Sequence, residues 1–272
     1  MLREVFLRFC KAGLIGILFL TVACATVPLS ERKALHLVSN SELAAMAFQQ
    51  YQEVLRKTKL STDPAKVQMV RSVGTRISRA TEEILRERGL ESEIKHYQWE
   101  FNLIEDDKTV NAWCMPGGKV AVYTGLLPLA ENETGLAVVM GHEIAHAVAN
   151  HGNERVSQGL LQQMGGMALS VALSTNPSAT SQIFMAAYGV GTTVGIMLPY
   201  SRTHESEADR IGLILMAKAG YDPREAIPFW QRMNQSGGSR PPELLSTHPA
   251  PETRIKQIEA LIPEALKYYK GS

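Results

Sequence analysis

The chain has 272 residues, with 28 lysines and arginines against 27 aspartates and glutamates, and 45% of its residues are hydrophobic. This length can bury a substantial core, and the composition excludes wholesale disorder and a collagen-like repeat. The net charge of +1 gives no signature of polyanion binding, so we expect no nucleic-acid partner. Three cysteines are too few for a disulfide framework.

The first 23 residues have the pattern of a secretory signal peptide. A basic region precedes the charge-free apolar stretch 12–23, which is too short to span a bilayer comfortably. The sequence that ends at Cys24 resembles a bacterial lipobox, which predicts lipidation of Cys24 and a membrane attachment through the lipid. Because Ala25 follows the cysteine, we expect an outer-membrane lipoprotein that faces the bacterial periplasm. Simple secretion with cleavage at 23–25 and an uncleaved membrane anchor are the alternatives.

The rest of the chain reads mostly as helix with one small sheet. The capping box Ser39-Asn40-Ser41-Glu42 predicts one helix start, and Asp63-Pro64 predicts another, for a helix that runs to about Gly89. The apolar period then changes from 3.6 to 2, which predicts strands. We expect strands at 97–104, 110–115 and 119–124. Later helices are expected at 133–150, 222–234 and 251–269, the last broken at Pro263, with a Gly/Pro-rich loop over 236–251.

Residues 156–201 contain no charged side chain. The uninterrupted apolar pieces of this segment, 164–173 and 183–198, are shorter than the roughly 20 residues that a membrane helix needs. We therefore favour a buried or partly exposed helical hairpin. A transmembrane or re-entrant segment is the alternative.

The motif that carries chemistry is His142-Glu143-Ile144-Ala145-His146, which is H-E-x-x-H inside a predicted helix. Residues four apart lie on one helix face, about 5–6 Å apart at Cβ, so both imidazoles can bind one Zn²⁺ at about 2.0–2.1 Å. Glu143 is placed to take a proton from a water that zinc activates. Histidines that match the motif by chance are the alternative, and the apolar, helical flank 136–140 argues against it.

A third ligand is expected from the segment 201–209. Glu205 and Asp209 are four apart on a predicted helix, so one carboxylate can bind zinc while the other accepts the outer N–H of a ligating imidazole. A solvated acidic helix face is the alternative, favoured if the pair is taken alone, and we assign Glu207 to it. His151 lacks the spacing and the glycine of the known third-histidine pattern, so we interpret it as a structural histidine.

Together these motifs resemble zinc metallopeptidase family forty-eight, the HtpX-like and prenyl-protease-like gluzincins. G-H-E-I-A-H and the later E-S-E-A-D are similar to the zinc-binding segments of the family, and the run from Asn111 to Gly118 is similar to its strand motif. Thr247-His248-Pro249 with Glu252-Thr253-Arg254 resembles its C-terminal segment. The similarity covers roughly residues 40–265.

The resemblance implies a gluzincin fold, mainly α with a small antiparallel β-sheet (α+β). It implies that His142, His146 and Glu205 bind one Zn²⁺, that Glu143 is the base, and that Asp209 supports a ligand. We expect a lipid-anchored linker at 24–38 and a single metallopeptidase domain at 39–272. Within this family, the chain resembles the soluble, lipid-anchored branch, which is similar to the BepA-like periplasmic enzymes.

Two further segments are candidates for contact with a substrate. The strand at 110–115 can hold an extended peptide through backbone hydrogen bonds, which makes Asn111 and Ala112 candidate substrate-binding residues, with a turn-flanking Asn as the alternative. Cys114 is expected to be a small packed residue. His248 has three interpretations. It can be a fourth zinc ligand that keeps the enzyme inactive, a donor that stabilises the tetrahedral oxyanion, or a structural residue before a helix.

Two classes of function remain open at this stage. The first is a zinc endopeptidase of the bacterial cell envelope, with unfolded or misassembled polypeptides as the substrates that the resemblance implies. The second is a chaperone or outer-membrane assembly factor on a protease fold, which has no need of the Glu143 carboxylate. A structural zinc site is a weaker idea, because such sites are normally closed by four ligands. No oligomeric state follows from these patterns.

Overall fold

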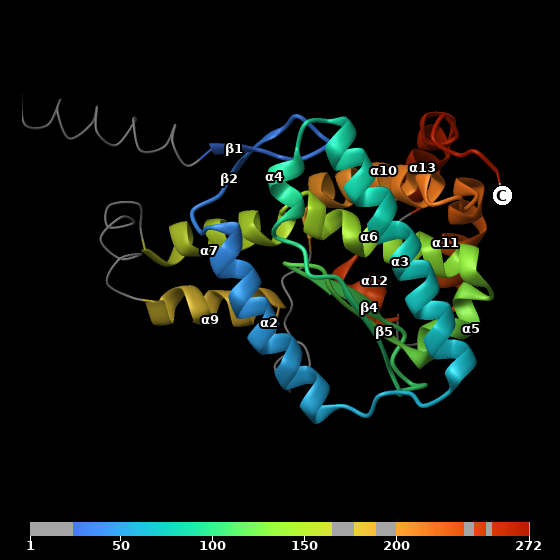
Figure 1. Ribbon diagram of the computed structural model, residues 1–272, viewed down its shortest axis with the longest axis horizontal. Coiled ribbons are helices and arrows are strands. Elements are labelled where there is room, and N and C mark those ends of the chain that lie inside the picture. The colour runs from blue at the N-terminus through green and yellow to red at the C-terminus, as the bar shows by residue number, and fades with distance from the viewer. Residues whose placement is uncertain (1–23, 165–176, 189–199, 237–241, 249–251, 272) are drawn as a thin grey trace, which may run out of the picture.

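The computed structural model describes residues 24–164, 177–188, 200–236, 242–248 and 252–271 (Figure 1). The predicted signal peptide lies outside these residues, as do 165–176 and 189–199 of the charge-free segment. Among the helices of the described part, none combines the length and the apolarity needed to cross a membrane. Lipidation of Cys24 stays a prediction.

Several helices, including the two that carry site residues, begin at capping residues. The Ser39 hydroxyl accepts from the Glu42 N–H at the start of α2 (Asn40–Lys57), and Asp63 caps α3 (Pro64–Glu87), so both predicted starts are confirmed. Asn132 caps α6 (Glu133–Val148) and Ser201 caps α10 (Arg202–Lys218). The described chain also contains α4 (Glu91–Ile94), α5 (Leu127–Ala130), α7 (His151–Met164), α9 (Pro177–Tyr188), α11 (Ala226–Gln235), α12 (Glu243–Thr247), α13 (Glu252–Ala265) and the short turns η1 (Thr124–Leu126) and η2 (Pro223–Glu225).

Three strands form a mixed sheet in the order β3-β5-β4. β3 (Glu100–Ile104) runs parallel to β5 (Lys119–Tyr123), and β4 (Ala112–Met115) runs antiparallel to β5. The predicted class, mainly α with a small sheet, is confirmed, although we expected only antiparallel pairing. The difference arises because the tight turn after β4 pairs β4 with β5, which leaves β3 to pair with the other side of β5. β4 is therefore an edge strand.

Both faces of this sheet are covered by helices. On one face, Phe101 and Val120 join a core with residues of α3 and α6, and on the other face Trp113 and Ala121 join a core with residues of α2, α7 and α9. This alternation follows from the period of two along a strand. Figure 1 shows α6 at the centre of the molecule, and it packs against α10, α3 and β4. The zinc-motif helix is thus held on several sides.

Some element boundaries differ from the prediction. β3 begins at Glu100 rather than at residue 97, because the N–H of Gln98 donates to Gly117 in the turn that precedes β5. α13 continues through Pro263, where a break was expected. The missing N–H there costs little because the helix ends two residues later, at Ala265. The predicted loop at 236–251 contains α12.

The segment 24–38, which we expected to be a linker, contains a second sheet. β1 (Cys24–Thr26) pairs antiparallel with β2 (Lys33–Leu35). Val27 and Ala34 are buried in the same core as α3 and α6. We call residues 24–35 the N-terminal hairpin.

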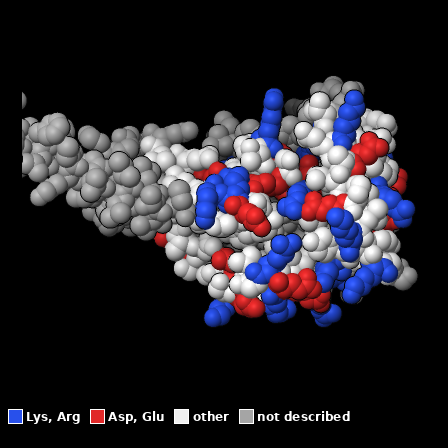
Figure 2. Space-filling view, turned by 90° about the horizontal axis from the view of Figure 1, so that it is seen from above, with Lys and Arg blue, Asp and Glu red and all other residues white. Residues whose placement is uncertain are grey.

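Surface charges of both signs are mixed. Figure 2 shows lysines and arginines interspersed with acidic side chains on the face seen from above. Ion pairs join many of them, for example Lys218 with Glu87 at 2.6 Å and Arg86 with Glu82 at 2.9 Å. Neither sign dominates this face.

Candidate metal centre

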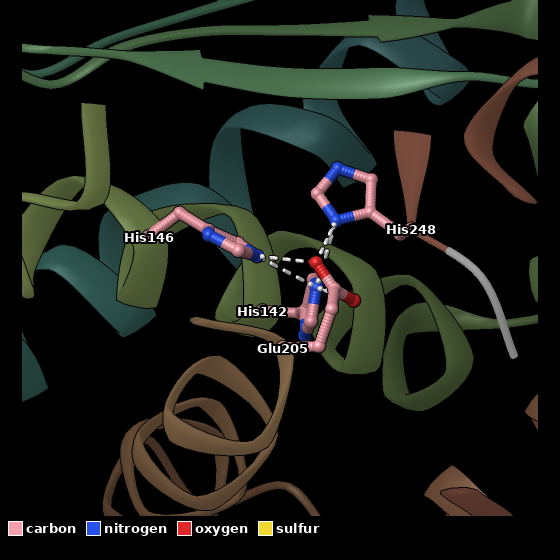
Figure 3. Close-up of side chains that lie close together, drawn as sticks. All are labelled: His142, His146, Glu205 and His248. Carbon is pink, nitrogen blue, oxygen red and sulfur yellow. Dashed lines mark hydrogen bonds and ion pairs between the residues drawn. The ribbon is translucent and has the colours of Figure 1, made fainter. Parts of the chain in front are cut away.

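Four side chains from three parts of the chain point toward one another (Figure 3). His142 and His146 come from α6, Glu205 comes from the first turn of α10, and His248 directly follows α12. All four are buried, and their possible ligand atoms lie within 4.8 Å of one another. The sequence suggested the first three as ligands and His248 as a candidate fourth, and the fold brings all of them together.

The distances within this cluster fit a small tetrahedral cation. The Nε2 atoms of His142 and His146 are 3.0 Å apart, and Nδ1 of His248 is 3.2 Å from Nε2 of His142. Oε1 of Glu205 is 3.3 Å from Nε2 of His146 and 2.8 Å from Nδ1 of His248. Ligand atoms around tetrahedral zinc, with bonds of about 2.0–2.1 Å, are separated by about 3.3 Å. The side chains are therefore arranged as a zinc ion requires.

His142 is oriented from behind by Asp209. Nδ1 of His142 lies 3.0 Å from Oδ1 of Asp209. Since a carboxylate only accepts, the neutral imidazole holds its proton on Nδ1, which leaves the lone pair of Nε2 facing the cluster. Burial acts to lower the pKa of His142, but the bonds to Asp209 and Glu205 outweigh it and raise this pKa to about 9 in the metal-free protein. The carboxylates thus favour a positive charge at this point, which a zinc ion supplies.

Arg254 holds the two carboxylates in place. Its Nε and Nη2 donate to Asp209 at 2.8 and 2.7 Å, and Nη1 lies 3.0 Å from Oε2 of Glu205. The guanidinium stacks 4.1 Å above the ring of Trp230. Burial acts to raise the pKa of Glu205, but the nearby His248 and the hydrogen bonds from the imidazoles hold it far below its usual range. Glu205 is therefore a carboxylate.

Glu143 lies beside the cluster without joining it. It is buried, and its Oε1 has no hydrogen-bond partner among the described residues, with Nε2 of His248 3.5 Å away. Burial raises the pKa of Glu143 above its usual range, in spite of the neighbouring His248 and His142. An unpaired, more basic carboxylate next to a metal site can accept a proton from a water held there.

Asn111 and Ala112 lie at the start of the edge strand β4, and both are buried. The side chain of Asn111 accepts from the N–H of Ala112 at 2.9 Å. The N–H of Leu244 in α12 donates to the carbonyl of Val110 at 3.2 Å, so α12 reaches the beginning of this strand.

Cys114 is a packed, buried thiol whose pKa is raised by burial.

Several side chains around the cluster had no role in the sequence-based account. The ring centroid of Tyr200 lies 3.9 Å from that of His146 and 5.0 Å from that of His248, but no local pattern marks this residue. Arg254 belonged to a recognised motif without an assigned role. His151, interpreted as structural, lies with Nδ1 2.9 Å from Nδ1 of His146.

Comparisons with known proteins agree on one family. The sequence profile of peptidase family M48 matches residues 72–262. The mitochondrial metalloendopeptidase OMA1 of Schizosaccharomyces pombe is 35% identical over 241 residues, which cover 88% of this chain and 66% of that protein. Human metalloendopeptidase OMA1, mitochondrial, is 29% identical over 97% of this chain and 51% of its own length. The beta-barrel assembly-enhancing protease of Escherichia coli is 30% identical over 72% of this chain and 39% of its own length.

These comparisons correct the predicted location. We expected a bacterial periplasmic, outer-membrane lipoprotein, and that prediction is contradicted by the relatives that cover most of the chain. The OMA1 proteins of fission yeast, cattle and human are all named as mitochondrial and align with 88%, 97% and 97% of it. The lipobox resemblance rests on the few residues before Cys24, whereas these alignments extend over the whole fold.

Proposed function

The chain belongs to peptidase family M48, and from this we propose that it is a zinc-dependent endopeptidase whose metal is held by His142, His146 and Glu205. The M48 peptidases use zinc, and the described residues contain a cluster with the donor atoms and spacings that zinc prefers. The observation that carries the proposal is the position of Glu143, a buried carboxylate beside this cluster whose Oε1 has no hydrogen-bond partner among the described residues. The relatives named above are metalloendopeptidases or proteases by name.

The residues around the metal have different roles in hydrolysis. Bound zinc supplies a Lewis acid that lowers the pKa of water to about 7 and polarises the scissile carbonyl. Glu143 accepts the proton from the attacking water and can return it to the leaving amine, as a general base that becomes a general acid. Asp209 and Arg254 keep His142 and Glu205 in position.

We assign the edge strand β4 to substrate binding. Among the described residues β5 is the one strand that pairs with β4, so an extended peptide could pair with the outer edge of β4. That peptide would add to β4 as an antiparallel strand, with Asn111 and Ala112 at the start of β4 beside it. Extended binding suits polypeptides that have lost their fold, so unfolded or misassembled proteins are the substrate class we propose.

In the conformation that the structure describes, His248 would block the metal position that the catalytic water needs. We call this arrangement the lock. Nδ1 of His248 lies 3.2 Å from Nε2 of His142 and 2.8 Å from Oε1 of Glu205, distances like the 3.0 Å between Nε2 of His142 and Nε2 of His146. An imidazole there takes the fourth position that a catalytic site keeps for water. This geometry favours the fourth-ligand interpretation over the oxyanion and purely structural ones.

The alternative function is a chaperone or assembly factor that binds polypeptides without cleaving them. The name of the Escherichia coli relative links that protein to assembly, but binding alone gives no reason for the Glu143 carboxylate. Casein hydrolysis by the purified chain separates the two. We expect cleavage that stops when a chelator removes the metal and returns when zinc is added, whereas casein binding without cleavage at any zinc level would favour the alternative.

A further inference from the structure

A line of hydrogen-bonded polar side chains leads from the second histidine of the cluster to the N-terminal hairpin. Nδ1 of His146 lies 2.9 Å from Nδ1 of His151, and Nε2 of His151 lies 3.2 Å from Oε2 of Glu207. The same Oε2 accepts from Nε of Arg32 at 2.8 Å. His151 is completely buried. The line therefore starts at an atom of the cluster and ends on residue 32 of the hairpin.

The hydrogen bonds along this line allow one arrangement of protons when both imidazoles are neutral. Glu207 is paired with a guanidinium and can only accept, so Nε2 of His151 carries the proton. Nδ1 of His151 is then an acceptor, and the proton between the two rings belongs to Nδ1 of His146. The lone pair of His146 is left on Nε2, the atom that lies 3.0 Å from Nε2 of His142 and faces the cluster.

The other described contacts of His146 belong to the cluster itself, as for Nε2 with Oε1 of Glu205 at 3.3 Å, or leave the proton unassigned. Tyr200 packs against the ring at 3.9 Å between centroids, and such a contact supports the plane of the imidazole without selecting the nitrogen that holds the proton. His142 receives its orientation from Asp209, on a separate branch. For His146, the outer partner is His151.

Arg32 bonds to acidic residues of both α7 and α10, the helices on either side of this line. Its Nη1 and Nη2 donate to Oε1 and Oε2 of Glu154 in α7 at 3.2 and 2.7 Å, while its Nε bonds to Glu207 in α10. Glu154 also lies 3.1 Å from Nε2 of His204, the neighbour of Glu205. One guanidinium thus spans the helix that begins with His151 and the helix that supplies the carboxylate ligand.

We propose that Arg32, Glu207 and His151 are positioning residues for the metal ligand His146, and that the N-terminal hairpin is thereby a working part of the zinc site. This inference rests on the proposed zinc function. Partners of this kind behind a ligating histidine typically contribute 10–100-fold to metal affinity. The hairpin would act through the hydrogen bonds above, without touching substrate or metal.

The test is the zinc dissociation constant of the full-length chain, measured by competition with a chromogenic chelator. We expect His151→Leu to weaken zinc binding about 10–100-fold. His151→Asn keeps an acceptor oxygen near the position of Nδ1 and should restore affinity to within about threefold of the parent. Arg32→Ala should weaken binding by about tenfold at most, because Glu207 remains.

Arg232→Ala is the matched control. The Arg232 side chain is 23% exposed and pairs with Glu131 and Glu225, whereas the Arg32 side chain is 26% exposed and pairs with Glu154 and Glu207. Both substitutions should lower the melting temperature of the metal-free protein, but only Arg32→Ala should change zinc affinity. Equal zinc affinities for these two variants would overturn the proposal.

The two His151 variants provide a second test of whether His151 positions His146. If His151→Leu binds zinc like the parent, or if His151→Asn loses as much affinity as His151→Leu, His151 does not position His146. If His151→Leu does not fold, the comparison of Arg32→Ala with Arg232→Ala decides alone. A parent protein that binds no zinc would instead refute the proposed function, so the two failures are distinguishable.

Discussion

The backbones of Gly141 in α6 and Gly212 in α10 touch where the two helices cross. A Cβ added to Gly212 would lie 2.9 Å from the amide nitrogen of His142, and a Cβ added to Gly141 would lie 2.9 Å from the carbonyl oxygen of Gly212. These neighbours are backbone atoms that cannot rotate away. The close crossing lets α10 bring Glu205 to the two histidines of α6.

We predict that Gly212→Ala destabilises the protein by about 3 kcal/mol, at the upper end of the usual cost of overpacking, because only movement of a whole helix can relieve the contact. The same movement should weaken zinc binding. Urea unfolding and chelator competition measure the two effects. Gly89→Ala is the control: Gly89 has φ +70 with nothing within 4 Å of an added Cβ, so it should cost about 1 kcal/mol and leave zinc affinity unchanged. Equal costs for both variants would contradict the argument.

His248→Ala should raise the rate of casein cleavage several-fold. The substitution removes the imidazole that lies 2.8 Å from Oε1 of Glu205 and frees the fourth position of the site for water. Turnover is measured at saturating zinc, with Ser246→Ala at a neighbouring exposed position as the control. A slower variant would indicate an oxyanion donor and an unchanged one a structural residue, and either would refute the lock.

The stability of the metal-free protein should depend on Glu154 in a defined pH window. Burial acts to raise the pKa of Glu154, but the bonds to His204 and Arg32 lower it from 4.5 to about 2. A carboxyl whose pKa is lowered by folding stabilises the protein fully above pH 4.5, and this contribution is lost as the pH falls toward 2.

The parent should therefore be more stable than Glu154→Gln at pH 6, and the difference in free energy of unfolding should shrink between pH 4.5 and pH 2. Denaturant unfolding of both proteins in the presence of a chelator measures it. A difference that stays constant across this window would show that Glu154 is not held as a paired carboxylate.

Local signals in the sequence predicted much of the fold. Ser39 and Asp63 cap their helices through bonds within the next three residues, so the pattern alone contains the necessary information. The pairing of β3 with β5 is different, because parallel strands are joined across a long connection that no neighbouring residue specifies. The mixed sheet could not be predicted for that reason.

The cluster and Asp209 behind it were predictable, but the positions of Arg254 and His151 were not. The i, i+4 spacings of His142 with His146 and of Glu205 with Asp209 mark one helix face each. The contact of His151 with His146 could not be predicted, because the helix was expected to run to about Asn150. In the structure α6 ends at Val148, and Asn150 adopts a φ of +54, after which α7 begins at His151. This change of direction places His151 against His146.

In the proposed mechanism, Glu143 is the base at a zinc site formed by His142, His146 and Glu205. Zinc content and casein cleavage are measured for the parent and Glu143→Gln in parallel. We predict one zinc ion per chain in both proteins and a loss of cleavage of about 100-fold or more in the variant, in keeping with the usual contribution of a general base. A variant that holds its zinc and cleaves casein as fast as the parent would contradict the account.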